Sequence, residues 1–272
     1  MADKTFLLGI GHQKCGTSWL YSYLEQMPKF NGGFTKEYHI WDALDVDEQK
    51  WNRPRPRMSH NFGMWRASRH GRRRRMMCRP GYYFDYFNGL YRGRARLTAD
   101  VTPSYSGLGA ERLAFIKRGF AARGVKVKAV ILVREPLSRI KSAVRFNLDR
   151  GNRVEGVQSD DGSFEEALAG YYRSPHCSLR TRYDATIRTA RKVFDEDDLH
   201  IGVYETMFTP QEVARVSDVL GVTAAPDYAD VVVNKTRNRV EDTELDREIR
   251  SYYAPVYDYC RKVVPQTRDA WG

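Results

Sequence analysis

The chain has 272 residues, of which 42% are hydrophobic and 29% charged, a composition ordinary for a globular protein with a sizeable core. It contains no run of about 18 apolar residues, so a transmembrane helix is excluded, and its first residues lack the apolar segment of a signal peptide. The four cysteines show no paired spacing such as C-x-x-C, which indicates neither a zinc site nor a disulfide framework. A reducing cytoplasm fits this cysteine usage best.

The formal net charge of +11 is concentrated in one part of the chain. Residues 51–100 contain 13 arginines, no lysine and only two acids, Asp85 and Asp100, so this stretch alone carries +11 and the remainder sums to zero. Local positive charge of this kind attracts polyanions such as nucleic acid, acidic glycans or anionic lipid. The alternative interpretation is a solvated loop or a disordered insert.

The stretch from residue 6 to residue 24 predicts a short apolar strand, a glycine-bearing loop and a helix from Thr17 to about Met27. Free N–H groups and the helix dipole at Thr17 favour an anion in this loop, and Lys14 and the Ser18 hydroxyl add donors. The order differs from the Walker A motif G-x-x-x-x-G-K-[ST], because Lys14 precedes Gly16 instead of following it. The sequence therefore predicts a phosphate site; the alternative is a tight turn with a solvated lysine.

A cluster of ionisable side chains follows at Lys36, Glu37, His39 and Asp42, beside aromatic residues. If residues 36–38 are extended, Glu37 and His39 share one face by the two-residue period of a strand. A carboxylate beside a histidine is suited to general-base chemistry. The alternative is ordinary surface charge next to a turn.

Residues 45–80 are polar, and we predict a loop or irregular excursion with one short helix. The aromatic run at 82–87 is expected in the core or in a pocket wall. Residues 97–105 predict a buried strand that ends at Pro103, with its polar end at the mouth of the sheet, where ligands bind in doubly wound folds.

The most convincing strand covers residues 126–133 and follows a helix predicted at 111–122. Arg134 stands at its carboxyl end, and Pro136 suits the first turn of the next helix, in which Ser138 and Ser142 share a face. A guanidinium and hydroxyls in this arrangement predict a second anion site. The alternative is an ion pair of Arg134 with Glu135 or another acid.

The remaining chain continues the alternation of strands and helices. We predict a loop at 149–162, helices at 163–166 onward and 178–194, a strand at 199–205, a helix from 209 to Gly221, a basic turn at 231–239 and a last helix at 242–263. This pattern predicts one α/β domain over residues 1–272, with a mainly parallel central sheet flanked by helices and an Arg-rich insert or lid at about 45–80.

Three motifs in this order resemble the sulfotransferases that use 3′-phosphoadenosine-5′-phosphosulfate (PAPS). The stretch from Gly11 to Ser18 looks like that family's 5′-phosphosulfate loop, and the stretch from Val133 to Ser142 looks like its 3′-phosphate motif. The sequence K-E-Y-H-I-W-D at 36–42 is similar to K-E-x-H-F-F-D of the heparan sulfate O-sulfotransferases. The resemblance spans about residues 5 to 262 and is closest to this carbohydrate branch.

The resemblance implies a role for each matching residue. Glu37 would take a proton from an acceptor hydroxyl, with His39 and Asp42 lining the acceptor site, Lys36 near the sulfuryl oxygens and Lys14 offsetting charge on the departing 5′-phosphate. Residues implied in donor binding are Lys14, Cys15, Gly16, Thr17, Ser18, Trp19, Arg134, Ser142 and Arg237. The donor would be PAPS, its product 3′,5′-adenosine bisphosphate (PAP), and no metal is required because sulfuryl transfer needs positioning and charge stabilisation.

The resemblance also sets expectations for partners and location. The acceptor carries a hydroxyl, with an anionic glycan as one candidate and a phenol, lipid or natural-product scaffold as others. The membrane anchor and late disulfide of the Golgi enzymes are missing, so we expect a cytoplasmic bacterial or viral protein, and the oligomeric state stays open. The rival hypotheses are a P-loop small-molecule kinase, which needs Mg²⁺ and a lysine after the last loop glycine, and a nucleic-acid-binding protein that uses Arg72–Arg75; nucleic acid is not the expected partner.

Overall fold

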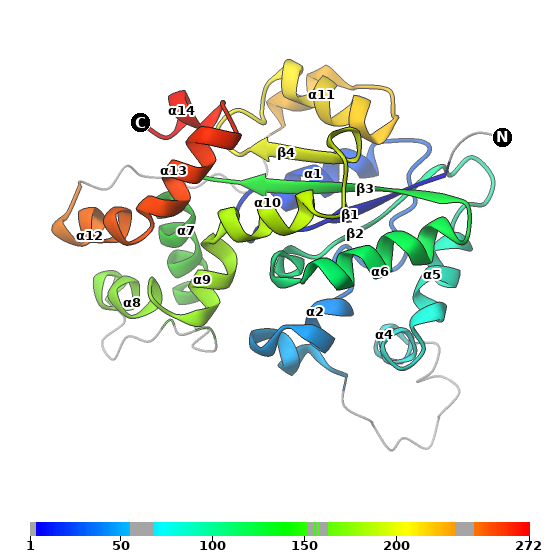
Figure 1. Cartoon of the computed structure of the whole chain (residues 1–272), viewed down its shortest axis with the longest axis horizontal. Helices are drawn as coiled ribbons and strands as arrows, with labels where there is room; N and C mark the ends of the chain where they lie inside the picture. Colours follow the sequence, from blue (N-terminus) through cyan, green and yellow to red (C-terminus); the bar gives the residue numbers. More distant parts are fainter. Residues whose placement is uncertain (1–3, 55–67, 152–154, 156, 158–162, 232–241) are drawn as a thin grey trace.

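A computed structural model describes residues 4–54, 68–151, 155, 157, 163–231 and 242–272 (Figure 1). Within them, one sheet of four parallel strands has the order β2-β1-β3-β4. The strands are β1 (Lys4–Gly9), β2 (Leu97–Val101), β3 (Val125–Val133) and β4 (Leu199–Val203). The predicted α/β class with a parallel central sheet is confirmed.

Helices connect the strands and cover the sheet. In Figure 1, α6 and α10 lie in front of the strands, whereas α1 lies behind them. The α-helices are α1 (Thr17–Glu25), α2 (Trp41–Asp45), α4 (Arg69–Cys78), α5 (Pro80–Asn88), α6 (Ala110–Ala121), α7 (Pro136–Leu148), α8 (Phe164–Tyr171), α9 (Pro175–Thr181), α10 (Tyr183–Arg191), α11 (Pro210–Leu220), α12 (Glu244–Tyr252), α13 (Ala254–Val263) and α14 (Thr267–Ala270). The short 3₁₀ helices are η1 (Asp47–Asn52), η2 (Pro103–Gly107), η3 (Glu196–Asp198) and η4 (Pro226–Asp230).

The strand order places the ligand site. From β1 the chain passes to β2 on one side and then crosses to β3 on the other side of β1, so the order reverses between β1 and β3. In open parallel sheets, ligands bind in the crevice outside the carboxyl ends of the strands at such a switch point. The loop after β1 and residue Arg134 after β3 both lie at this point.

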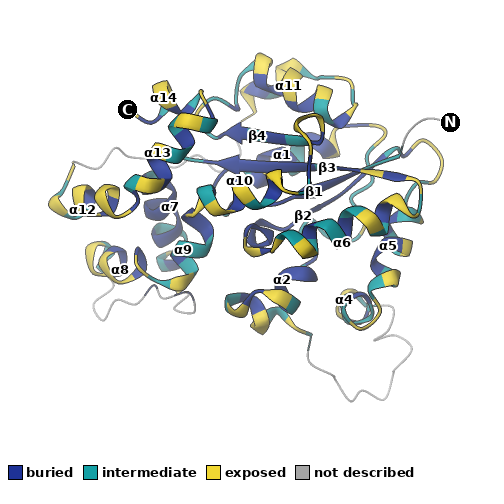
Figure 2. Cartoon of the chain, in the orientation of Figure 1, coloured by how far each residue is buried: buried dark blue, intermediate teal, exposed yellow. Residues whose placement is uncertain are grey.

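The sheet is buried on both faces, as Figure 2 shows by its dark colour. Phe6 of β1 stacks on Phe120 of α6 at 3.9 Å between ring centroids, and it meets Phe87 of α5 edge-on at 4.8 Å. The aromatic run at 82–87 thus forms α5 and contributes core residues, as predicted. Burying these rings is a large part of the hydrophobic stabilisation of the fold.

Two predicted helices are each divided in the structure. The helix expected at 178–194 breaks at Arg182, whose ψ of 64° is not helical, and Tyr183 then packs into the core as the first residue of α10. The helix expected at 242–263 breaks between α12 and α13, because Pro255 has no N–H for the helical ladder and its ring collides with the preceding turn. The first helix ends at Glu25, two residues before the predicted end.

The Arg-rich stretch holds more regular structure than a loop with one short helix. It includes the end of α2, the 3₁₀ helix η1 and the ten-residue helix α4, which Ser68 caps by accepting from the N–H of Gly71. Arg53 donates to the carbonyls of Ala43 and Leu44 at 2.6 and 3.1 Å, so its guanidinium caps the end of α2. The part of this stretch at 55–67 lies outside the described residues, and so does the basic turn predicted at 231–239, apart from its first residue; Arg237 is among the residues not described.

None of the helices in the described ranges is both long enough and apolar enough to cross a bilayer.

Candidate active site

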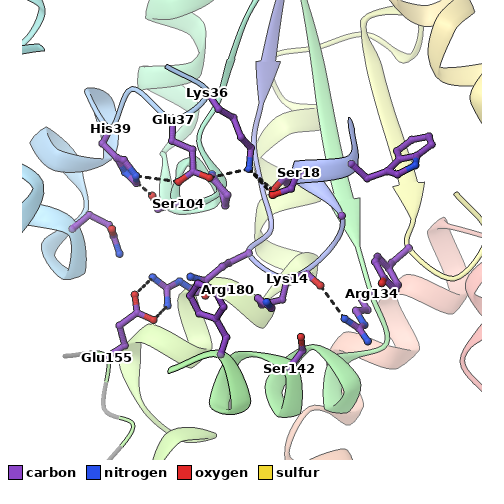
Figure 3. A pocket seen from close by; sticks show the side chains of 18 of the residues that line it. Lys14, Ser18, Lys36, Glu37, His39, Ser104, Arg134, Ser142, Glu155 and Arg180 are labelled. Carbon is purple, nitrogen blue, oxygen red and sulfur yellow. Dashed lines mark hydrogen bonds and ion pairs between the residues drawn. The ribbon is translucent and has the colours of Figure 1, made fainter. Parts of the chain in front are cut away.

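A cavity of about 580 Å³ opens at the switch point between β1 and β3 (Figure 3). It joins the loop after β1, the end of β3 and the segment that contains Glu37. Its lining includes Gln13, Lys14, Gly16, Thr17, Ser18, Trp19, Lys36, Glu37, His39, Gln49, Trp51, Pro103, Ser104, Arg134, Ser142, Phe146, Arg150, Glu155, Arg180, Tyr204 and Phe208. Both predicted anion sites and the predicted base therefore face one cavity.

The loop after β1 presents backbone donors to this cavity. Gly16 is the N-cap of α1 with φ 93°, a left-handed conformation that favours glycine, and a Cβ there would lie 2.5 Å from the Met207 sulfur. Because Gly16 has no side chain to cap α1, the first N–H groups of this nine-residue helix are available to an anion. Thr17, Ser18 and Trp19 of the first turn all line the cavity.

Lys14 adds a full positive charge to the loop. Its ammonium lies over the Phe146 ring, 4.3 Å from the centroid, and within the described residues it forms no ion pair. Burial lowers the pKa of Lys14, and the nearby guanidinium groups of Arg134 and Arg150 lower it further. A bound anion would relieve both effects, so this lysine is suited to hold a phosphate or sulfate group.

Arg134 and Ser142, the residues of the second predicted anion site, also line this cavity, and Arg134 adjoins the loop that carries Lys14. The Arg134 guanidinium stacks on the Tyr204 ring at 4.3 Å and donates to the carbonyl of Lys14 at 3.3 Å, while its Nε is buried with no partner in the described structure. The alternative pairing with Glu135 is absent, since Glu135 caps α7 and binds the Tyr257 hydroxyl. Ser142 lines the same cavity from α7.

Lys36, Glu37 and His39 form a contiguous charged group. The Lys36 ammonium donates to Glu37 Oε1 at 2.9 Å and to the hydroxyls of Thr17 and Ser18 at 3.3 and 3.2 Å. Glu37 Oε2 lies 3.3 Å from His39 Nε2. Burial alone would raise the pKa of Glu37, but the contacts with His39 and Lys36 outweigh it and lower the pKa to about 2. Glu37 is therefore an ionised carboxylate near neutral pH.

Asp42 and Ser104 orient the His39 imidazole from its Nδ1 side, opposite the nitrogen that faces Glu37. His39 Nδ1 lies 2.7 Å from Asp42 Oδ2, which also accepts from the Ser104 hydroxyl at 2.5 Å. Burial lowers the pKa of His39, but the contacts with Asp42 and Glu37 outweigh it and raise the pKa to about 9. The imidazole is therefore protonated near neutral pH and donates to both carboxylates.

The backbone of this segment is anchored on the end of β2. The N–H of Val101 donates to the Lys36 carbonyl at 3.0 Å, and the N–H of Tyr38 donates to the Thr102 hydroxyl at 3.0 Å. His39 has φ 52°, a conformation that costs a residue other than glycine of order 1–3 kcal/mol and persists only where its surroundings hold it. The anchors on β2 explain how the charged side chains face the end of α1.

Two of the residues implied in the site lie away from the cavity. The thiol of Cys15 is fully buried near the Tyr183 hydroxyl at 3.7 Å, and burial raises its pKa to about 12, so its side chain faces the core. Asp42 is also fully buried; it does not line the cavity itself but contacts two residues that do, His39 and Ser104. Arg237 is not among the described residues.

The sequence analysis missed other residues of the cavity, above all a buried ion pair. Arg180 of α9 donates to both carboxylate oxygens of Glu155, at 2.6 Å for one of them, and both side chains are almost fully buried. Figure 3 shows this pair across the cavity from Glu37. Neither residue belongs to a local motif, so only the tertiary structure reveals them. Tyr204, in contrast, stands directly after β4, and Ser104 lies in η2, which closely follows β2, so a signal was present for both.

We expect Asp42→Asn to lower the pKa of His39 from about 9 towards its ordinary value near 6.5. A histidine whose pKa is raised by folding stabilises the native state fully below about pH 6.5 and loses this contribution as the pH rises through 9. The variant should therefore lose stability at pH 6 and little at pH 10. NMR titration of the imidazole, assigned with His39→Gln, and urea unfolding at both pH values measure this. An unchanged imidazole titration would contradict it.

Within the described residues there is no group of three or more His, Cys, Asp or Glu side chains that is placed to hold a metal ion. The absence of a metal requirement stays a prediction.

The chain resembles several solved structures. A sulfotransferase from Alicyclobacillus acidocaldarius superposes with a TM-score of 0.59 and 23% identity, over 97% of this chain and 96% of that one. The sulfotransferase domain of the curacin biosynthetic pathway matches with a TM-score of 0.50 and 12% identity, over 93% of this chain and 98% of that one. No protein-family model and no curated protein sequence matches. These neighbours give no support to the heparan sulfate branch suggested by the motifs. The architecture is that of the sulfotransferase fold, a single α/β domain with a parallel central sheet.

Proposed function

We propose that the protein is a PAPS-dependent sulfotransferase that transfers a sulfuryl group to an acceptor hydroxyl. The observation that carries the proposal is the single cavity that is lined both by the residues of the two predicted anion sites and by Lys36, Glu37 and His39. The resemblance to solved sulfotransferases concerns the fold and is consistent with this chemistry.

The cavity suits the donor substrate at both of its charged ends. The N-terminus of α1 and Lys14 would bind the 5′-phosphosulfate, and Arg134 with Ser142 would bind the 3′-phosphate, which ATP lacks. The unpartnered Arg134 Nε is a donor that an anion would satisfy. The side chain of Trp19 stacks on Tyr23 and lines the cavity, and we place it next to the adenine ring of the donor.

Lys36 connects the donor site to the base. Its ammonium bridges the Thr17 and Ser18 hydroxyls and the Glu37 carboxylate. Sulfuryl oxygens above Thr17 and Ser18 would compete with Glu37 for this ammonium. A loosened contact raises the proton affinity of Glu37, which in the free chain is held low by Lys36 and His39. Glu37 would then accept the proton of the acceptor hydroxyl, while Lys36 and Lys14 offset charge on the sulfuryl and departing phosphate groups.

The acceptor is proposed to enter beside Glu37 and His39, where the cavity is lined by Gln49, Ser104 and the largely exposed Trp51. An exposed indole at this edge offers a flat apolar face for a ring of the acceptor. The proposal commits to a hydroxyl-bearing acceptor; an anionic glycan remains one candidate within that class.

Calorimetric titration with PAP tests the proposal, with ATP as the comparison ligand and each measured with and without Mg²⁺. We expect PAP to bind in the micromolar range or tighter without metal and ATP to bind at least tenfold more weakly, because only PAP engages Arg134 and Ser142.

Preference for Mg-ATP would contradict the proposal and favour a small-molecule kinase. Binding of neither nucleotide, together with salt-sensitive binding of a mixed-sequence oligonucleotide, would instead favour a nucleic-acid-binding protein.

A further inference from the structure

Arg73 lies in the run of four arginines at 72–75, yet its guanidinium is turned inward. Its Nε donates to the carbonyl of Tyr38 at 2.6 Å, and its Nη2 donates to the carbonyls of His39 and Asn52, both at 3.0 Å. Arg73 is half-buried, and this partial burial lowers its pKa. These bonds link α4, η1 and the segment that carries Glu37 and His39.

The contacts of Arg73 complete the anchoring of that segment. The end of β2 holds the segment through the N–H of Tyr38, and Arg73 holds the carbonyls of Tyr38 and His39. His39 adopts φ 52°, a left-handed conformation that persists only where its surroundings fix it. A planar guanidinium with donors in a fixed fork can hold three carbonyls at set angles, whereas an ammonium acts as a point charge.

We propose that Arg73 is a positioning residue that fixes the backbone of residues 38 and 39, and through it the Glu37 carboxylate and the His39 imidazole, in their working geometry. The inference rests on the proposed function. The run of four arginines at 72–75 is then not simply a basic surface, because one of its members, Arg73, holds the backbone of the active-site segment.

The neighbouring arginines provide a matched control. Arg72 packs over the Phe34 ring at 5.7 Å and Arg75 over the Tyr82 ring at 4.6 Å. Arg74 has neither a hydrogen bond nor an ion pair in the described part of the chain, and it lies next to Arg73 on the same helix. Arg74→Ala therefore removes the same charge from the same helix without touching residues 38 and 39.

Arg73 also faces a second cavity of about 370 Å³, which it shares with Thr35, Lys36, Glu37, His39, Arg69 and His70. Removing its side chain would leave a hole that solutes in this cavity can reach. Exogenous guanidinium can therefore replace the lost group in Arg73→Ala, which a general loss of folding would not allow.

The experiment compares wild type, Arg73→Ala, Arg73→Lys and Arg74→Ala in PAP affinity, thermal unfolding and the transfer of sulfate from PAPS to a phenol, which serves as the probe acceptor. We expect kcat to fall about 100-fold in Arg73→Ala and about tenfold in Arg73→Lys, because a displacement of about 1 Å has effects of this size. PAP affinity should stay within about threefold, and Arg74→Ala should match wild type. Guanidinium chloride well below unfolding concentrations should restore Arg73→Ala at least tenfold, whereas NaCl of equal ionic strength should not.

Turnover of Arg73→Ala within threefold of wild type would overturn the inference. So would an unfolded Arg73→Ala together with an unfolded Arg73→Lys, since Arg73 would then support the fold as a whole. A wild-type chain that neither binds PAP nor transfers sulfate would instead contradict the proposed function. In that case the His39 titration, measured by NMR in the free chain, still decides: a lower pKa in Arg73→Ala than in Arg74→Ala supports the inference, and equal values overturn it.

Discussion

Replacing Glu37 with glutamine is expected to lower kcat by about 10²- to 10⁴-fold, the contribution typical of a positioned general base. This corresponds to roughly 3–5 kcal/mol of transition-state stabilisation. The amide keeps the shape of the carboxylate but cannot take a proton, so the acceptor hydroxyl would lose its proton to solvent. The remaining rate would rise with pH throughout the range, whereas the wild-type rate would level off above the pKa of Glu37, which is about 2 in the free chain and rises when the bound donor loosens the Lys36 contact.

Turnover, measured with saturating donor from pH 5 to 9, and PAP affinity, measured by calorimetry, test this expectation. PAP affinity should change little, because Glu37 meets the donor site only through Lys36. Glu48→Gln is the matched control: it makes the same chemical change on η1, and Glu48 is not among the residues that line the cavity. A Glu37→Gln enzyme within tenfold of wild type, with an unchanged pH profile, would remove Glu37 from the role of base.

The parts of the site that follow directly from strand ends were accessible to sequence reasoning. In a parallel sheet the glycine-bearing loop after β1 and Arg134 after β3 are expected at the same edge. They are neighbours there because β1 pairs with β3, and this strand order was not predicted. The Glu37–His39 pair was predicted from a two-residue period. The structure brings the two side chains together by a different route, since His39 has a positive φ and Arg73 holds its carbonyl.

The interactions that the sequence did not predict depend on distant contacts. Arg180 and Glu155 are 25 residues apart and pair only because α9 packs beneath the cavity, and no local pattern distinguishes Arg73 from its three neighbours. The break at Arg182 likewise has no helix-breaking residue, and the packing of Tyr183 beside His12 and Cys15 determines it. Pro255, in contrast, was a visible signal for the break before α13.

Arg134→Gln is expected to weaken PAP binding about 10- to 100-fold, the size of one or two charge-assisted hydrogen bonds to a phosphate. The binding of 5′-AMP, which has no 3′-phosphate, should weaken by less than about threefold. AMP makes no contact through a 3′-phosphate, so its binding should be affected only indirectly. This indirect effect is expected because Arg134 also donates to the Lys14 carbonyl and so supports the loop. The preference for PAP over AMP should therefore nearly vanish in this variant.

Lys14→Met is expected to give the complementary result, because its ammonium, which lines the cavity, is proposed to bind the 5′ end of the donor. Both PAP and AMP should bind about tenfold or more weakly, and the ratio of their affinities should be preserved.

Calorimetry with PAP and AMP tests both expectations on wild type and on the two variants. Arg118→Gln is the control, because Arg118 is exposed on α6 and its replacement removes one positive charge away from the site. If Arg134→Gln weakened PAP and AMP equally, Arg134 would act through the loop alone, and the assignment of a separate 3′-phosphate site would be wrong. A changed ratio only in Arg134→Gln would establish two distinct anion sites in one cavity, the arrangement on which the proposed sulfuryl transfer depends.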